Sequence, residues 1–169
     1  MSAAPDKGRL AAAFACLAVV AVQLAGCGED QRESRPLFYA SLDTASARVD
    51  AATAAGMISN YRRNNGLGPV AADPGLERMA QAEAQAMAAA DKPASADSVK
   101  ARLAAAGVAA PAANLSAGYR TLAEAFSGWR EQPQNNRVML DAKATRLGIA
   151  TAYAPQSKYK VYWALILAK

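Results

Sequence analysis

Residues able to perform acid, base, nucleophilic or metal chemistry are few in this 169-residue sequence, which contains no histidine. Without histidine there is no Ser-His-Asp triad, no Cys-His pair and no imidazole ligand for a metal. Both cysteines, Cys16 and Cys27, fall within the first 27 residues, so the rest of the chain has neither a thiolate site nor a disulfide of its own. These counts exclude most hydrolase mechanisms and a histidine- or cysteine-based metal site.

The remaining candidates for acid–base chemistry are carboxylates, and none forms an evident pair. Glu124 and Glu131 lie seven residues apart in an expected helix, and Asp91 and Asp97 flank Ser95 without a base to activate its hydroxyl. We therefore expect no enzymatic activity and no cofactor. A hydrolase that uses Asp, Glu or Tyr alone is the alternative.

The basic residues do not form the cluster that nucleic acid binding requires. The net charge is +5, but Arg and Lys are scattered along the chain and often lie near Asp or Glu. We expect Arg62, Arg63, Arg120 and Arg130 to form a solvated face. No nucleic acid partner is predicted.

The N-terminal segment has the parts of a secretion signal. Lys7 and Arg9 precede an apolar stretch over residues 10–24, which is shorter than the roughly 20 residues of a membrane-spanning helix. The stretch ends in Leu24-Ala25-Gly26-Cys27, which resembles the lipobox of bacterial lipoproteins. The resemblance implies recognition of Leu24, Ala25 and Gly26 by a signal peptidase, cleavage before Cys27, and lipid attachment to Cys27.

The sequence after Cys27 predicts a tethered domain. Residues 29–36 are polar and charged, which is typical of a tether. We therefore divide the chain into a signal peptide at 1–26, a lipidated cysteine and tether at 27–42, and a folded domain at 43–169. Position 28 is Gly rather than Asp, which by resemblance to Gram-negative lipoproteins favours the outer membrane and a domain facing the periplasm. The lipid anchor makes the membrane an expected partner.

Periodicity predicts the elements that position the polar residues of the domain. Helical spacing begins at about Asp43 and stops at 64–69, a second helix opens at Asp73-Pro74, and Thr121 caps a later one. Residues 114–119 form a short strand or a loop, and residues 146–153 and 158–168 form two strands. Both faces of the last strand are apolar, so it should be central and covered on both sides. The expected fold is α+β, a three-layer α-β-α sandwich with a small antiparallel sheet between helices.

Several segments, taken in order, resemble the CAP superfamily of cysteine-rich secretory proteins, antigen 5 and pathogenesis-related 1 proteins. The opening pieces are 58–67 (ISNYRRNNGL), 73–76 (DPGL) and 80–87, followed by 114–122 (NLSAGYRTL), 125–130 (AFSGWR) and 137–140 (RVML). Residues 144–150 and 159–165 resemble the two closing strands. The resemblance covers about residues 54–168, fits a short bacterial branch of the family, and implies an α-β-α sandwich.

The family's cavity carries two His and two acidic residues, which bind a divalent cation in some members. By this resemblance the Glu before the family Asn corresponds to Ala113, and the second His corresponds to Asn135. By the same resemblance the first His belongs in the loop after Met87, near Ser95. The cation site is therefore expected to be lost, and we expect a degenerate cavity lined by Asn114, Tyr119, Gln132 and Asn135.

These observations predict a lipid-anchored, non-catalytic CAP-like domain that acts as a binding or interaction module in the bacterial cell envelope. The alternative is a carrier of a lipid or other small hydrophobic ligand, because small residues between helices leave room for an apolar molecule. The expected ligand is thus a lipid or an envelope protein.

Overall fold

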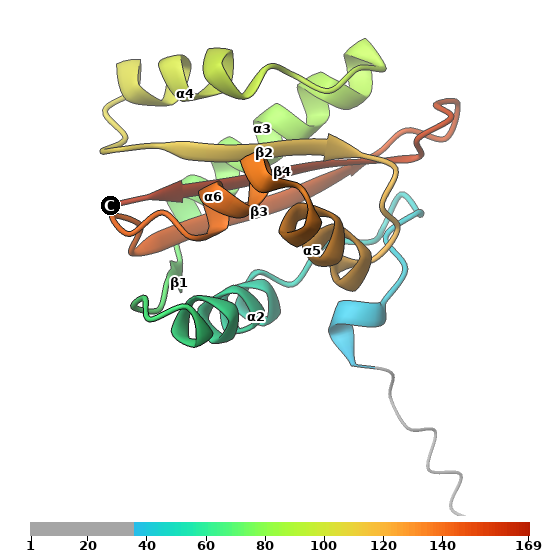
Figure 1. The fold of residues 1–169 in the computed structure, drawn as a ribbon. Helices are drawn as coiled ribbons and strands as arrows, with labels where there is room; N and C mark the ends of the chain where they lie inside the picture. The colour runs from blue at the N-terminus through green and yellow to red at the C-terminus, as the bar shows by residue number, and fades with distance from the viewer. Residues whose placement is uncertain (1–35) are drawn as a thin grey trace, which may run out of the picture. The chain divides into compact units, whose positions relative to one another are not determined.

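The computed structural model describes residues 36–169 (Figure 1). The predicted signal peptide, Cys27 and most of the tether lie outside the described residues. The helical elements are η1 (Leu37–Tyr39), α2 (Ala51–Asn64), α3 (Pro74–Ala90), α4 (Ala96–Ala105), α5 (Leu122–Glu131) and α6 (Pro133–Met139). The strands are β1 (Ala71–Ala72), β2 (Ala112–Ala117), β3 (Arg146–Tyr153) and β4 (Val161–Ala168).

Capping side chains determine where three of the helices begin. Asp73 accepts a hydrogen bond from the N–H of Leu76, and Thr121 accepts one from Glu124, as the sequence predicts. The predicted start of the first long helix at about Asp43 is wrong, because the Asp50 side chain caps α2 by accepting from the N–H of Thr53. Residues 43–50 are irregular instead.

The sheet has the strand order β1-β3-β4-β2. β4 pairs antiparallel with both β2 and β3, and all eight of its residues are buried, which confirms its predicted central place. Residues 112–117 form a strand, and this decides between the two interpretations of the segment around Asn114. The sequence did not predict β1, whose two residues pair parallel with β3, so the sheet is not wholly antiparallel.

The alternation along β4 divides the core into two layers. Val161, Trp163 and Leu165 pack beneath α2, α5 and α6, while Tyr162, Ala164 and Ile166 face α3 and α4. Figure 1 shows the two groups of helices on opposite faces of the sheet. The predicted three-layer α-β-α sandwich is confirmed.

One buried arginine corrects the expected solvated basic face. Arg62 is 1 % exposed, near the C-terminal end of α2. Its guanidinium donates four hydrogen bonds of 2.8–3.0 Å to the backbone carbonyls of Gly68, Met139, Asp141 and Ala144. Arg62 therefore joins α2 to the end of α6 and the segment that follows it. It supplies hydrogen-bond donors to carbonyls that no helix or strand pairs.

Candidate functional site

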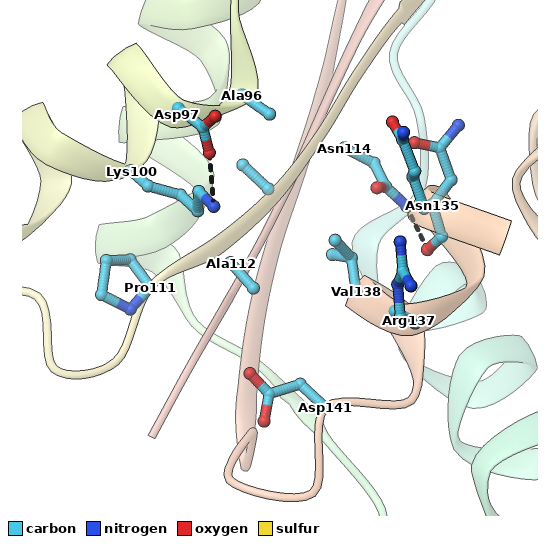
Figure 2. Close-up of a pocket in the computed structure, with 12 residues that line it drawn as sticks. Ala96, Asp97, Lys100, Pro111, Ala112, Asn114, Asn135, Arg137, Val138 and Asp141 are labelled. Carbon is cyan, nitrogen blue, oxygen red and sulfur yellow. Dashed lines mark hydrogen bonds and ion pairs between the residues drawn. The ribbon is translucent and has the colours of Figure 1, made fainter.

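A cavity of about 530 Å³ lies between α4, β2 and α6 (Figure 2). Its lining is contributed by the start of α4, the first half of β2 with the proline before it, α6, and Asp141 just after α6. The lining residues are Ala96, Asp97, Lys100, Pro111, Ala112, Ala113, Asn114, Gln134, Asn135, Arg137, Val138 and Asp141. This volume is within the range of small-molecule sites in proteins.

Asn114 forms a buried part of the lining. Its side chain is 1 % exposed, and Nδ2 donates a 3.0 Å hydrogen bond to the backbone carbonyl of Asn135. The amide oxygen, Oδ1, is buried and has no hydrogen-bond partner, and it is the single such side-chain atom among residues 36–169. An unpaired buried acceptor typically costs about 1–3 kcal/mol, so Oδ1 is a group that a donor would stabilise.

The opposing walls of the cavity carry both signs of charge. On the α4 wall the Lys100 ammonium lies 2.7 Å from the Asp97 carboxylate, and this contact lowers the pKa of Asp97. Arg137 and Asp141 lie on the α6 side, and Arg137 makes no ion pair within residues 36–169. Figure 2 shows the Asp97–Lys100 pair across the cavity from Asn114 and Asn135. The cavity therefore offers an unpaired guanidinium on one side.

The structure brings together two of the four residues predicted for the cavity. Asn114 and Asn135 both line it. Gln132 does not line it but accepts a 2.8 Å hydrogen bond from Nδ2 of Asn135, so it contacts a lining residue. Tyr119 lies away from the cavity, because its ring packs against Gly128 and its carbonyl accepts from Nε1 of Trp163.

Sequence reasoning missed the charged residues of the lining. Asp97 and Lys100 are three residues apart on α4, beside the buried stripe of Val99 and Leu103, so their spacing could have indicated one shared face. No local signal placed Arg137 and Asp141 at the cavity, because α6 meets β2 only in the folded chain.

The lining does not fit the divalent cation of the family's cavity. The lining has no imidazole, its two carboxylates are Asp97, which is paired with Lys100, and Asp141, and side-chain amides supply further polar groups. Across residues 36–169, no three His, Cys, Asp or Glu side chains gather closely enough to hold a metal ion. Over the same residues, no helix is long and apolar enough to cross a membrane.

Comparison with known protein families shows to which family the chain belongs. The CAP family, described as the cysteine-rich secretory protein family, matches residues 55–167. The chain belongs to the CAP family. The match spans the helices and strands that build the cavity, from α2 to β4.

Solved CAP-like structures share the fold at low sequence identity. A cysteine-rich secretory protein from Staphylococcus aureus is 15 % identical, with a TM-score of 0.57, over 70 % of this chain and 37 % of that one. An extracellular protein containing an SCP domain from Bacillus anthracis is 17 % identical, with a TM-score of 0.57, over 69 % of this chain and 39 % of that one.

A third structure is comparable in length to this CAP domain. An outer surface protein from Borrelia burgdorferi is 12 % identical, with a TM-score of 0.59, over 73 % of this chain and 97 % of that one. By contrast, the match spans under two fifths of the two longer bacterial proteins. No curated protein sequence matches the chain. At these identities the structural likeness establishes the fold alone.

Proposed function

We propose that this protein is a lipid-anchored CAP domain of the bacterial cell envelope that binds a small polar ligand without catalysing a reaction. The observation that carries the proposal is the unpaired Oδ1 of Asn114, which is buried at a cavity of about 530 Å³. The lipobox at Leu24–Cys27 supports the anchor, and the extracellular and outer-surface descriptions of the structural neighbours agree with an envelope location.

The chemistry of the lining indicates the class of ligand. Oδ1 of Asn114 can accept a hydrogen bond and has no donor, so the ligand should present an N–H or O–H group. Arg137 has no ionic partner within residues 36–169 and can pair with a carboxylate. A small molecule with both an amide N–H and a carboxylate satisfies the two groups together.

The lining also argues against divalent-cation chemistry in this cavity. The two positions that correspond to a family Glu and a family His hold Ala113 and Asn135. Neither side chain can act as a general base near neutral pH, and neither replaces the missing ligand. We therefore propose that binding in this domain has become independent of a cation.

The carrier alternative receives less support from the same cavity. A site for an acyl chain is lined mainly by apolar side chains. Here Asp97, Lys100, Arg137 and Asp141 contribute charge, and Gln134 and Asn135 contribute amides. The large apolar side chains of both core layers are packed against each other rather than against open space.

Native mass spectrometry of residues 28–169, expressed without Cys27 and purified without detergent, tests this proposal. We expect a bound polar molecule of a few hundred daltons that denaturing solvent releases. The variant Asn135→Ala should carry less of it, because the rim loses an amide. Asn60→Ala is the matched control, since Asn60 is exposed on α2, remote from the cavity lining, and should keep the full load.

Each other result contradicts a specific part of the proposal. A bound lipid would replace it with the carrier alternative, and a bound divalent cation would show that the cavity still holds a metal. A bare chain mass for the wild type would exclude a small-molecule ligand and leave a protein partner. Metal-dependent hydrolysis that Asn135→Ala abolishes would overturn the non-catalytic role.

A further inference from the structure

Two large apolar side chains project into solvent from the short turn that begins the described chain. Leu37 is 61 % exposed and Tyr39 is 55 % exposed, and they are the exposed large hydrophobic residues among residues 36–169. Both belong to η1 (Leu37–Tyr39). Most other large apolar residues of the domain pack into or against its two core layers.

The geometry of η1 imposes this exposure. A 3₁₀ turn has three residues per turn, so successive side chains point about 120° apart. Phe38 packs inward against the core cluster that contains Trp129, while Leu37 and Tyr39 stay exposed, with the Tyr39 ring centroid 4.6 Å from that of Phe38. The chain just after the turn is held in place, because the N–H of Leu42 donates a 2.8 Å hydrogen bond to the carbonyl of Arg120.

The surface beside Tyr39 carries one acidic side chain, Glu124. Tyr39 borders a hollow on α5 with Thr121, Ala123, Glu124 and Ser127. The Glu124 carboxylate in this hollow accepts a 2.7 Å hydrogen bond from the backbone N–H of Arg120, which fixes the direction of the side chain. Hydroxyl groups and a methyl group form the rest of the hollow.

We propose that Leu37 and Tyr39 contact the membrane surface to which Cys27 is anchored, so that η1 orients the domain on the bilayer. This inference rests on the lipid anchor of the proposed function. Nine residues, 28–36, separate Cys27 from Leu37, so the turn stays within about 35 Å of the anchor even if the chain is fully extended. Tyr is enriched at the membrane interface because its ring is apolar and its hydroxyl is polar, and Leu adds an apolar side chain that the bilayer can bury.

The size of the patch favours a bilayer over a protein partner. A stable protein interface buries about 1,200–2,000 Å², which two side chains on one turn cannot supply. A chain already held at the surface by lipid needs only a weak additional contact, because the tether raises the effective concentration of the turn at the bilayer. In Figure 1, α4 lies on the other side of the sheet from η1, so this orientation directs α4 and its wall of the cavity away from the membrane.

The test uses the full lipidated chain in vesicles of phosphatidylethanolamine and phosphatidylglycerol. Since Cys27 is acylated in that chain, the introduced cysteine of Pro36→Cys can be labelled selectively with an environment-sensitive fluorophore. We expect lipids with a spin label near the headgroup to quench this fluorophore. The double variant Leu37→Ser/Tyr39→Ser should lose at least half of the quenching. A fluorophore on Ala101→Cys, exposed on α4, is the matched control and should show little quenching in either background.

Two measurements separate failure of this inference from failure of the anchor. Palmitate incorporation reports the anchor, and an unchanged melting temperature shows that the double variant folds. Palmitate incorporation with equal quenching in the wild type and the double variant would overturn the η1 contact alone. A chain that takes up no palmitate would overturn the anchor and this inference with it.

Discussion

At the scale of single residues, Arg62 shows how a charged side chain can complete a core. The guanidinium donates to four carbonyls contributed by the loop after α2 and by the segment that leads from α6 into β3. Burial lowers the pKa of Arg62, while the charge of Asp141 opposes that shift. No helix or strand can satisfy these carbonyls, so the arginine does what secondary structure does elsewhere.

Arg62→Leu should therefore destabilise the domain by about 3 kcal/mol or more, because it leaves several buried acceptors unpaired. Urea unfolding followed by circular dichroism measures the loss. The neighbouring Arg63→Leu removes an exposed guanidinium on the same helix and should change the free energy of unfolding by less than about 0.5 kcal/mol. Equal effects for the two variants would contradict the role given to Arg62.

A second residue-scale feature is the hydrogen-bonded group at the end of α3. The buried Tyr162 hydroxyl donates to the Asp91 carboxylate and lies 2.9 Å from the Ser157 hydroxyl. Hydrogen bonds from Ser157 and Tyr162 lower the pKa of Asp91 from its ordinary value of 3.8. Burial, with the hydrogen bond to Asp91, raises the pKa of Tyr162.

The lowered pKa of Asp91 predicts a loss of stability in acid. A carboxyl whose pKa is lower in the folded state contributes stability above its unfolded pKa, and that stability is lost as the pH falls through the folded value. Asp91→Asn should thus have a lower urea midpoint than the wild type at pH 7, with the gap narrowing below the ordinary value of 3.8. Glu131→Gln is the control, since Glu131 is exposed and forms no ion pair within residues 36–169. A gap that is constant with pH would contradict this account.

At the scale of elements, Gly148 lets α3 and β3 approach each other closely. A Cβ built on Gly148 would lie 2.1 Å from the backbone carbonyl carbon of Leu76 and 2.4 Å from the backbone nitrogen of Glu77. Glycine at this position therefore lets the first turn of α3 lie directly on the strand. The atoms that a side chain at position 148 would meet are backbone atoms of α3, so no flexible side chain can move aside to make room.

Gly148→Ala should destabilise the domain by about 3 kcal/mol, because α3 must shift to admit one methyl group. Gly56→Ala is the matched control, since its Cβ would meet no atom within 4 Å. Gly56 lies in α2, where alanine is the better helix former, so this change should stabilise the domain by about 0.5–1 kcal/mol. Thermal unfolding of both variants decides the point, and a neutral Gly148→Ala would contradict the close packing.

The sequence predicted an element correctly where the signal for it lies in a few adjacent residues. The caps at Asp73 and Thr121 were predicted, because each depends on a few adjacent residues. β1 was missed, because a strand of two alanines has no pattern of its own and forms only by pairing with β3. The start of α2 was placed too early because the periodicity begins before the Asp50 cap that interrupts it.

At the scale of the whole molecule, the three layers bring α4, β2 and α6 together around one cavity. The sequence predicted its two asparagines through a family resemblance rather than through local chemistry. It could not predict that Lys100 and Arg137 would share that cavity, because they lie on different helices 37 positions apart in the chain. The misplaced Tyr119 shows the same limit, since its direction depends on the space left by Gly128 on α5.

The central claim is that this cavity binds through side-chain amides and Arg137 in place of a cation. Nuclear magnetic resonance of the Asn114 side-chain amide tests it most directly, with N-acetylglycine as a probe that carries one amide N–H and one carboxylate. We predict that N-acetylglycine shifts the Asn114 signals in wild type but not in Arg137→Gln, and that ZnCl₂ leaves them unchanged. Saturable shifts with ZnCl₂, or shifts with N-acetylglycine that persist in Arg137→Gln, would contradict the account.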